Sequence, residues 1–170
     1  LENGYVGCLV EANPKYCNEW DIFISEKGLQ ATILNELIRY HSDSLDTLFS
    51  NEFDLTDIGV LLLDIDGSEY MLLEGMKKFR PKLICVEYDN SYPLNMDYIP
   101  TSPGHGRRYQ ASSLSMFQLM KSKDYLYLTS FFQDHIFIER NTYENFLNTS
   151  SIDLPAGDLL FYQNAPQHLF

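Results

Sequence analysis

The feature that most constrains the fold is a short run of apolar residues at 58–63 that is followed directly by carboxylates. A continuous apolar run of this length is typical of a strand buried on both faces, as the strands of parallel sheets are. Asp64, Asp66 and Glu69 come immediately after it. Asp66 or Ser68 could also act simply as a cap of the next helix, since short polar residues favour that position.

A second predicted strand has the same arrangement. Residues 67–79 carry apolar side chains at helical spacing, and Pro81 ends this predicted helix. Residues 82–88 then form another apolar run, which contains Glu87. Ligands of open α/β sheets bind at the carboxyl ends of strands. The strand, helix, strand order therefore predicts two parallel strands with Asp64 and Glu87 at their carboxyl ends.

The N-terminal part predicts further alternation of strands and helices. Residues 5–10 are expected to form a strand that ends near Glu11, and Pro14 suits the first turn of a following helix. A second strand is predicted at 22–25. Apolar residues spaced three and four apart then predict an amphipathic helix at 27–40.

The C-terminal half contains a long connection at 89–111, rich in proline and glycine. Connections of this length are commonly functional. Ser112 or Ser113 is expected to cap the next helix. Two aromatic-rich runs at 125–129 and 135–139 predict an antiparallel strand pair at the edge of the sheet.

Composition narrows the classes of partner. The chain has 170 residues, of which 45% are hydrophobic, enough for one domain with a real core. Its formal net charge of −12 argues against a surface that binds nucleic acid or an anionic membrane. No apolar stretch approaches the roughly 20 residues needed to span a bilayer. Three sparse cysteines without metal-ligand spacing favour reduced thiols and a cytoplasmic location.

Several segments together resemble the FkbM-type family of S-adenosylmethionine-dependent methyltransferases. The similar segments are Ser44-Leu45-Asp46-Thr47-Leu48, Val60-Leu61-Leu62-Leu63-Asp64-Ile65-Asp66-Gly67-Ser68-Glu69-Tyr70, Leu73-Glu74-Gly75-Met76 and Val86-Glu87-Tyr88. The resemblance implies a class I, Rossmann-like α/β fold: a mostly parallel sheet with helices on both faces and an antiparallel C-terminal strand pair. It implies one methyltransferase-like domain at 1–140, with 141–170 as an extension that packs on the domain or contacts a partner.

The resemblance also implies roles by position. Glu11 matches the acid that binds the ribose hydroxyls of the cofactor, and Asn13 belongs to the same segment. Asp64 matches the acidic position beside the methyl donor and acceptor, and contributes to cofactor binding. Glu87 matches the acid at the tip of the next strand. Asp66 stands where many relatives have Glu, which leaves its role open.

The acidic residues allow more than one chemistry. Asp64, Asp66 and Glu87 could orient an acceptor hydroxyl, take its proton, or hold a divalent cation such as Mg²⁺ or Ca²⁺. His105, between two glycines of the long loop, is a further candidate for proton removal. An ordinary exposed histidine is the competing interpretation.

One expected motif is absent from the sequence. Class I methyltransferases place a glycine-rich loop after their first strand, where the backbone approaches the cofactor closely. Nothing before residue 5 supplies that strand and loop. We therefore expect either a fragment of a longer protein or a reduced relative, with the first strand missing. We also expect weak or absent binding of S-adenosylmethionine by this chain.

The leading functional prediction is an O-methyltransferase-like domain that acts on a hydroxyl of a small molecule or sugar. The alternative is a catalytically inactive binding or assembly module with the same fold. A metal-dependent hydrolase that uses Asp64 and Asp66 is a poorer match, because the usual Thr/Ser and Lys partners of acidic phosphotransfer sites are not evident. A homo-oligomer could form through the extension at 141–170.

Overall fold

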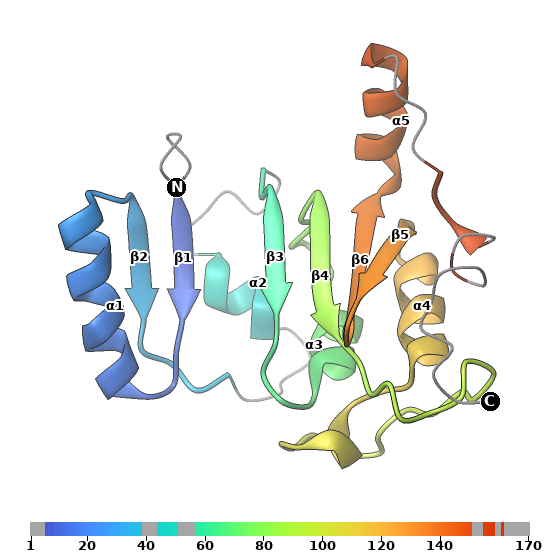
Figure 1. The fold of residues 1–170 in the computed structure, drawn as a ribbon, viewed down its shortest axis with the longest axis horizontal. Coiled ribbons are helices and arrows are strands. Elements are labelled where there is room, and N and C mark those ends of the chain that lie inside the picture. The colour runs from blue at the N-terminus through green and yellow to red at the C-terminus, as the bar shows by residue number, and fades with distance from the viewer. Residues whose placement is uncertain (1–5, 39–43, 51–56, 151–154, 159–160, 162–170) are drawn as a thin grey trace. The chain divides into compact units, whose positions relative to one another are not determined.

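The computed structural model describes residues 6–38, 44–50, 57–150, 155–158 and 161. The chain divides into two compact units, Leu1–Arg39 and Tyr40–Phe170 (Figure 1). Each unit is described by itself. Within the described ranges, no helix combines the length and the apolar character needed to cross a bilayer.

The first unit contains two parallel strands joined by a helix: β1 (Gly7–Val10), α1 (Pro14–Lys27) and β2 (Ala31–Leu34). Pro14 occupies the first turn of α1, as predicted, where its missing N–H costs no hydrogen bond. Asn13 caps the helix, because its side chain accepts a hydrogen bond from the backbone N–H of Lys15.

Two predictions for this unit were wrong. The strand predicted at 22–25 lies inside α1, which ends only at Gly28, a left-handed C-cap with φ 63°. The predicted helix at 27–40 is contradicted over its described part, 27–38, which contains β2, and Ile33 of β2 pairs with Leu9 of β1. A short apolar run suits a strand or a helix equally, and here the pairing with β1 decided the outcome.

The second unit contains a four-stranded mixed sheet in the order β3-β4-β6-β5. Strands β3 and β4 are parallel, which confirms the predicted pair, and β6 runs antiparallel to both β4 and β5. The predicted antiparallel pair at the sheet edge is therefore also confirmed. The elements are α2 (Ser44–Phe49), β3 (Val60–Leu63), α3 (Glu69–Gly75), β4 (Leu83–Glu87), the 3₁₀ turn η1 (Arg107–Tyr109), α4 (Ser113–Ser122), β5 (Tyr125–Phe131), β6 (Asp134–Glu139) and α5 (Arg140–Thr149).

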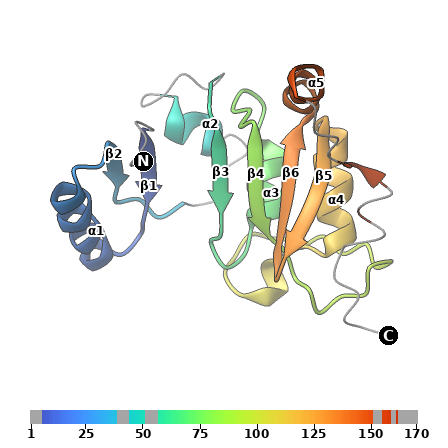
Figure 2. The same cartoon turned by 45° about the horizontal axis from the view of Figure 1, so that its top comes forward.

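Helices α3 and α4 cover one face of this sheet (Figure 2). Side chains that alternate along the strands point into this layer, because successive residues of a strand face opposite sides. The buried apolar residues of this unit include Leu45, Leu61, Leu63, Leu73, Ile84, Val86, Met116, Met120, Tyr125, Tyr127 and Phe137. The result is an α/β layer compatible with a Rossmann-like fold.

The opposite face of β3 is open. Val60 and Leu62 expose 58% and 74% of their surface, whereas Leu61 and Leu63 between and after them are buried. The prediction that this strand is buried on both faces was wrong, because the described helices that pack on the sheet lie on the other side. Helices on both faces of this sheet are not seen in the described part of the chain.

Helix α3 is shorter than the helix predicted at 67–79. It begins only at Glu69, because Asp66, Gly67 and Ser68 have positive φ angles of 57°, 129° and 76°. Three successive left-handed residues cannot join a right-handed helix. The chain therefore makes a tight turn between β3 and α3, at the end of the sheet where the carboxylates lie.

Candidate functional site

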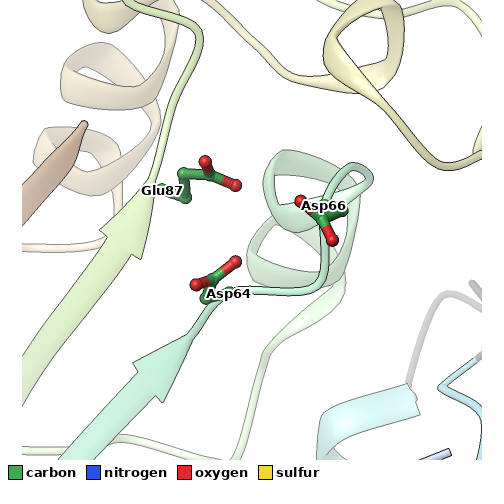
Figure 3. A group of neighbouring side chains, drawn as sticks. All are labelled: Asp64, Asp66 and Glu87. Atoms are coloured by element: carbon green, nitrogen blue, oxygen red, sulfur yellow. The ribbon is translucent and has the colours of Figure 1, made fainter.

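Three carboxylates meet where β3 and β4 end. Asp64 follows β3, Asp66 lies in the turn before α3, and Glu87 is the last residue of β4 (Figure 3). Their closest carboxylate oxygens all lie within 4.8 Å of one another. Asp64 and Asp66 are exposed and Glu87 is half-buried. The parallel pairing explains this meeting, because parallel strands deliver their carboxyl ends to one edge.

Glu69 holds the turn that carries two of these acids. Its Oε1 accepts hydrogen bonds from the backbone N–H of Gly67 (2.8 Å) and of Ile65 (3.2 Å). The side chain is fully buried, and burial, followed by the negative charge of Asp64, raises the pKa of Glu69. Ser68 sits at the N-cap position of α3 but makes no side-chain capping hydrogen bond. Glu69 therefore stabilises this turn through its two backbone hydrogen bonds. The alternative interpretation of the sequence, in which Ser68 caps the helix with its side chain, does not describe the contacts of Ser68.

The long loop after β4 returns to the same turn. The backbone N–H of Ser68 donates to the carbonyl of Tyr109 (2.9 Å), and the N–H of Gly106 donates to the carbonyl of Asp66. A Cβ atom at Gly67 would lie 2.6 Å from the carbonyl oxygen of Gly104. The loop thus packs directly on the acidic turn, at a distance that only glycine permits.

The loop is also closed at its base. The backbone N–H of Asp89 donates to the carbonyl of Ala111 (2.9 Å), and Asp89 and Ser112 form an isolated parallel bridge. The hydroxyl of Ser112, the N-cap of α4, donates to the carbonyl of Met96 (2.7 Å). The predicted long connection is therefore an ordered segment with both ends tied together.

The loop brings His105 to the edge of the acidic turn. Its Nδ1 lies 3.2 Å from the carbonyl oxygen of Ile65, and the side chain is exposed. A carbonyl oxygen can only accept a hydrogen bond, so Nδ1 must be the donor in this contact. In the neutral ring, Nε2 is then the atom that can accept a proton. The structure thus places His105 next to the segment that holds Asp64 and Asp66.

The surroundings of Glu87 raise the proton affinity of its carboxylate above the ordinary value of a glutamate. The pKa of its carboxyl group is raised to about 7, first by burial and then by four negative neighbours. Those neighbours, in order of effect, are Asp64, Glu69, Asp66 and Asp134. A carboxylate with a pKa near neutrality can take up and release a proton under ordinary conditions.

Gln110 was missed by the sequence analysis. Its side-chain Nε2 donates a hydrogen bond to Oε2 of Glu87, and the residue is buried. Gln110 lies 23 residues from Glu87 and reaches it only because the loop returns to the sheet. No local pattern around Gln110 marks it, so the tertiary structure alone identifies this contact.

The predicted cofactor residues of the first unit lie at the end of β1. Oε1 of Glu11 accepts a hydrogen bond from the backbone N–H of Asn13 (2.7 Å). The Nδ2 of Asn35 donates to the carbonyl of Glu11 (2.8 Å) and so joins this turn to the segment after β2. The side-chain oxygen of Asn13 accepts from Lys15 as the helix cap. A carboxylate oriented in this way can accept hydrogen bonds from hydroxyl groups.

Comparisons with known proteins give one family. No curated protein and no solved structure matches the chain. The sequence model of the family described as "Methyltransferase FkbM domain" matches residues 10–127, which is well over half of the chain. This range contains Glu11, the acidic turn, Glu87 and the long loop with His105. The chain therefore belongs to the FkbM methyltransferase domain family.

Proposed function

We propose that this chain is an S-adenosylmethionine-dependent O-methyltransferase domain that methylates a hydroxyl group of a small molecule or sugar. Membership of the FkbM family supports methyltransferase activity, and the family is generally dependent on this cofactor. The observation that carries the proposal is the meeting of Asp64 with Glu87, whose pKa is raised to about 7. A site for hydroxyl methylation needs such a group near its acceptor to receive a proton.

The polar residues at the end of β1 in the first unit suit the ribose part of the cofactor. Glu11 would accept hydrogen bonds from the ribose hydroxyls, and the backbone N–H of Asn13 orients its carboxylate for this. The side chain of Asn13 maintains the start of α1, so we assign it an indirect part in cofactor binding. When bound, the cofactor supplies an electrophilic methyl group. Asp64, at the end of β3 in the second unit, stays a predicted cofactor-binding residue through the family resemblance alone.

Glu87 is the group that we assign to proton removal. Gln110 holds Oε2 of Glu87, which leaves Oε1 to accept the proton of the acceptor hydroxyl. The negative charge of Asp64 would support this step, because it raises the proton affinity of Glu87. Nε2 of His105 is a second atom that could receive the proton. Positioning of the acceptor against the methyl group would supply most of the rate enhancement.

The predicted divalent cation would bind to Asp64, Asp66 and Glu87. Three carboxylates within 4.8 Å of one another are suitable hard oxygen ligands for Mg²⁺ or Ca²⁺. This assignment stays a prediction. Titration of the protein with Mg²⁺, followed by the amide signals of 64–67 in NMR spectra, checks it. Absence of any shift at millimolar Mg²⁺ would remove the cation from the proposal.

Formation of S-adenosylhomocysteine from S-adenosylmethionine, with pools of hydroxyl compounds as acceptors, tests the function. The full-length protein should form this product, and Glu87→Gln and Asp64→Asn should each reduce the rate by at least about a hundredfold. Glu144→Gln on α5 is the matched control, because Glu144 is an exposed acid outside the site. Product formation that is unchanged in Glu87→Gln would contradict the assigned role. Absence of product with every acceptor would favour the inactive binding module.

A further inference from the structure

The tip of the β5–β6 hairpin displays two adjacent aromatic rings. Phe131 and Phe132 expose 65% and 74% of their surface. Their ring centroids lie 4.5 Å apart in an edge-to-face arrangement. Exposed apolar side chains are ordinary when they are scattered singly, but paired rings at one tip form a local apolar surface. The packing of the fold gives no reason for them, because neither ring is buried.

Backbone conformation gives a second, independent observation. Phe132 has a φ of 54°, in the left-handed region that bulky residues rarely adopt. It is the first residue of a two-residue turn, where Gly, Asn or Asp is the usual choice. The chain therefore keeps a phenylalanine where a glycine would be less strained. Strained residues of this kind often occur at functional sites.

The strand register places this tip beside the acidic site. Phe131 pairs with Asp134 on β6, and Asp134 pairs with Glu87 on β4. Directly paired residues lie on the same face of a sheet, and adjacent strands are about 4.8 Å apart. The backbone of Phe131 is therefore roughly 10 Å from that of Glu87, on the same face. The charge of Asp134 contributes to the raised pKa of Glu87, which agrees with this closeness.

That face of the sheet is accessible at this end. Cys85, two residues before Glu87, shares its face and pairs with Leu62, which is 74% exposed. The row formed by Glu87, Asp134 and Phe131 therefore runs along an open rim. A small molecule that lies along this rim would contact an acid at one end and aromatic rings at the other.

We propose that Phe131 and Phe132 form an acceptor subsite, which binds the apolar ring or chain of a molecule whose hydroxyl group lies at Glu87. This inference rests on the proposed function and narrows its substrate class. The acceptor would be a hydroxyl compound with an aryl or alkyl portion, rather than an unsubstituted sugar. The aromatic rings would bind that portion by stacking and exclusion of water.

The acidic charge around the two rings and the small area of the rings favour a small molecule over a membrane, a nucleic acid or a protein partner. The acids next to the rings and the net charge of −12 would repel an anionic membrane or a nucleic acid. Two phenyl rings also supply much less area than the roughly 800 Å² per partner that a stable protein interface buries. Continuity of the rings with the acidic row matches a ligand of small size and neutral or positive charge.

An NMR titration with two related probes tests the subsite. The protein, with ¹³C-labelled phenylalanine, is titrated with phenyl β-glucoside and, in parallel, with methyl β-glucoside. The phenyl compound should shift the signals of Phe131 and Phe132, and the methyl compound should not. Phe131→Ser and Phe132→Gly should each weaken binding of the phenyl compound by several-fold, up to roughly tenfold.

The melting temperature of one of these variants and one control variant separate a binding role from a structural one. Phe132→Gly should raise the melting temperature, because it relieves the left-handed strain, while it weakens probe binding. Phe23→Ser on α1 is the matched control, since Phe23 is also exposed and also makes an edge-to-face contact, with Trp20. Its probe affinity should equal that of the unmodified protein.

Several outcomes would overturn the subsite. These are probe shifts confined to other residues, unchanged affinity in both hairpin variants, or self-association of the protein that Phe132→Gly abolishes without any response to the probe. The probe needs neither cofactor nor methyl transfer. Probe binding without formation of S-adenosylhomocysteine would therefore refute the proposed function alone, and methyl transfer that ignores both rings would refute the subsite alone.

Discussion

The hydroxyl group of Ser68 makes two hydrogen bonds to the backbone of Gly104, donating to its carbonyl at 2.9 Å and accepting from its N–H at 2.8 Å. The two residues are 36 positions apart in the sequence. Their contact joins the turn after β3 to the loop after β4. The loop residues His105 and Gln110 therefore depend on this contact for their position beside the acids.

Gly67→Ala should disrupt this junction. The new Cβ would lie 2.6 Å from the carbonyl oxygen of Gly104, and the φ of 129° is one that residues with a Cβ rarely adopt. We expect the free energy of unfolding to fall by about 1–3 kcal/mol or more, and the loop to become sensitive to proteases. Chemical denaturation and limited proteolysis measure the two effects.

Gly59→Ala is the control for that substitution. A Cβ at Gly59 would meet no heavy atom within 4 Å, and its φ is not positive. The free energy of unfolding should change by less than about 0.5 kcal/mol. Equal destabilisation by the two substitutions would show that the crowding at Gly104 is not important.

Asp64→Asn should affect function far more than stability. Asp64 is exposed at the tip of β3, and its carboxylate packs against no core, so we expect a change in unfolding free energy within about 0.5 kcal/mol. Methyl transfer should fall strongly, because the negative charge that raises the proton affinity of Glu87 is lost. Thermal melts and product assays on the same preparation provide the comparison. A large loss of stability with retained activity would give Asp64 a structural role instead.

Truncation of two neighbouring leucines of β3 should cost very different amounts of stability. Leu63 is buried, so Leu63→Ala should cost about 2–5 kcal/mol of stability. From the sequence alone, Leu62 would be expected to show the same cost. The structure exposes 74% of Leu62, so Leu62→Ala should cost well under 1 kcal/mol. Urea denaturation of the two variants distinguishes them, and similar costs would mean that Leu62 is covered in solution.

His135 should make stability depend on pH. The ring is fully buried, stacks on Tyr88 at 3.8 Å, and lies 2.8 Å and 2.6 Å from the hydroxyls of Ser113 and Ser130. Burial lowers the pKa of His135 from 6.5 to about 3. Below pH 6.5 the unfolded chain therefore takes up a proton that the folded protein does not. This contribution to stability is complete above pH 6.5 and is lost progressively as the pH falls toward 3.

Comparison with His135→Phe isolates this effect, because phenylalanine retains a ring but does not titrate. Over the range from about pH 6.5 to 4.5, the unmodified protein should lose up to about 1.4 kcal/mol per pH unit more than the variant. The raised pKa of Glu87 acts in the opposite direction over this range and is common to both proteins. Equal slopes in denaturant melts would mean that His135 is charged in the folded state.

The 170-residue chain should bind S-adenosylmethionine weakly or not at all. Among the described residues of the first unit, we assign the ribose a single carboxylate, that of Glu11, and one carboxylate does not form a whole wall of a cofactor pocket. Isothermal titration calorimetry measures the affinity. In any longer form that binds, Glu11→Ala should weaken binding. Micromolar affinity of this chain alone would mean that another segment has rebuilt the pocket.

The β3–α3–β4 segment was predictable because its signals are local. An apolar run, a helical period and a second apolar run require only the spacing of neighbouring residues. Parallel strands then bring Asp64 and Glu87 together through a general property of such sheets. The same local method failed at 22–25 and 27–40, where short apolar runs suit either kind of element and the pairing of β1 with β2 decided between them.

The sequence by itself determined which acids end up at the edge of the sheet, since strand polarity follows from the order of the elements. Only the tertiary structure decided the conformation of the turn, the burial of Glu69 and the approach of Gln110 to Glu87. These features depend on the return of the loop, which joins residues far apart in the chain. The exposure of Phe131 and Phe132 was also decided there, because the type of a residue alone does not tell whether neighbouring parts of the fold cover it.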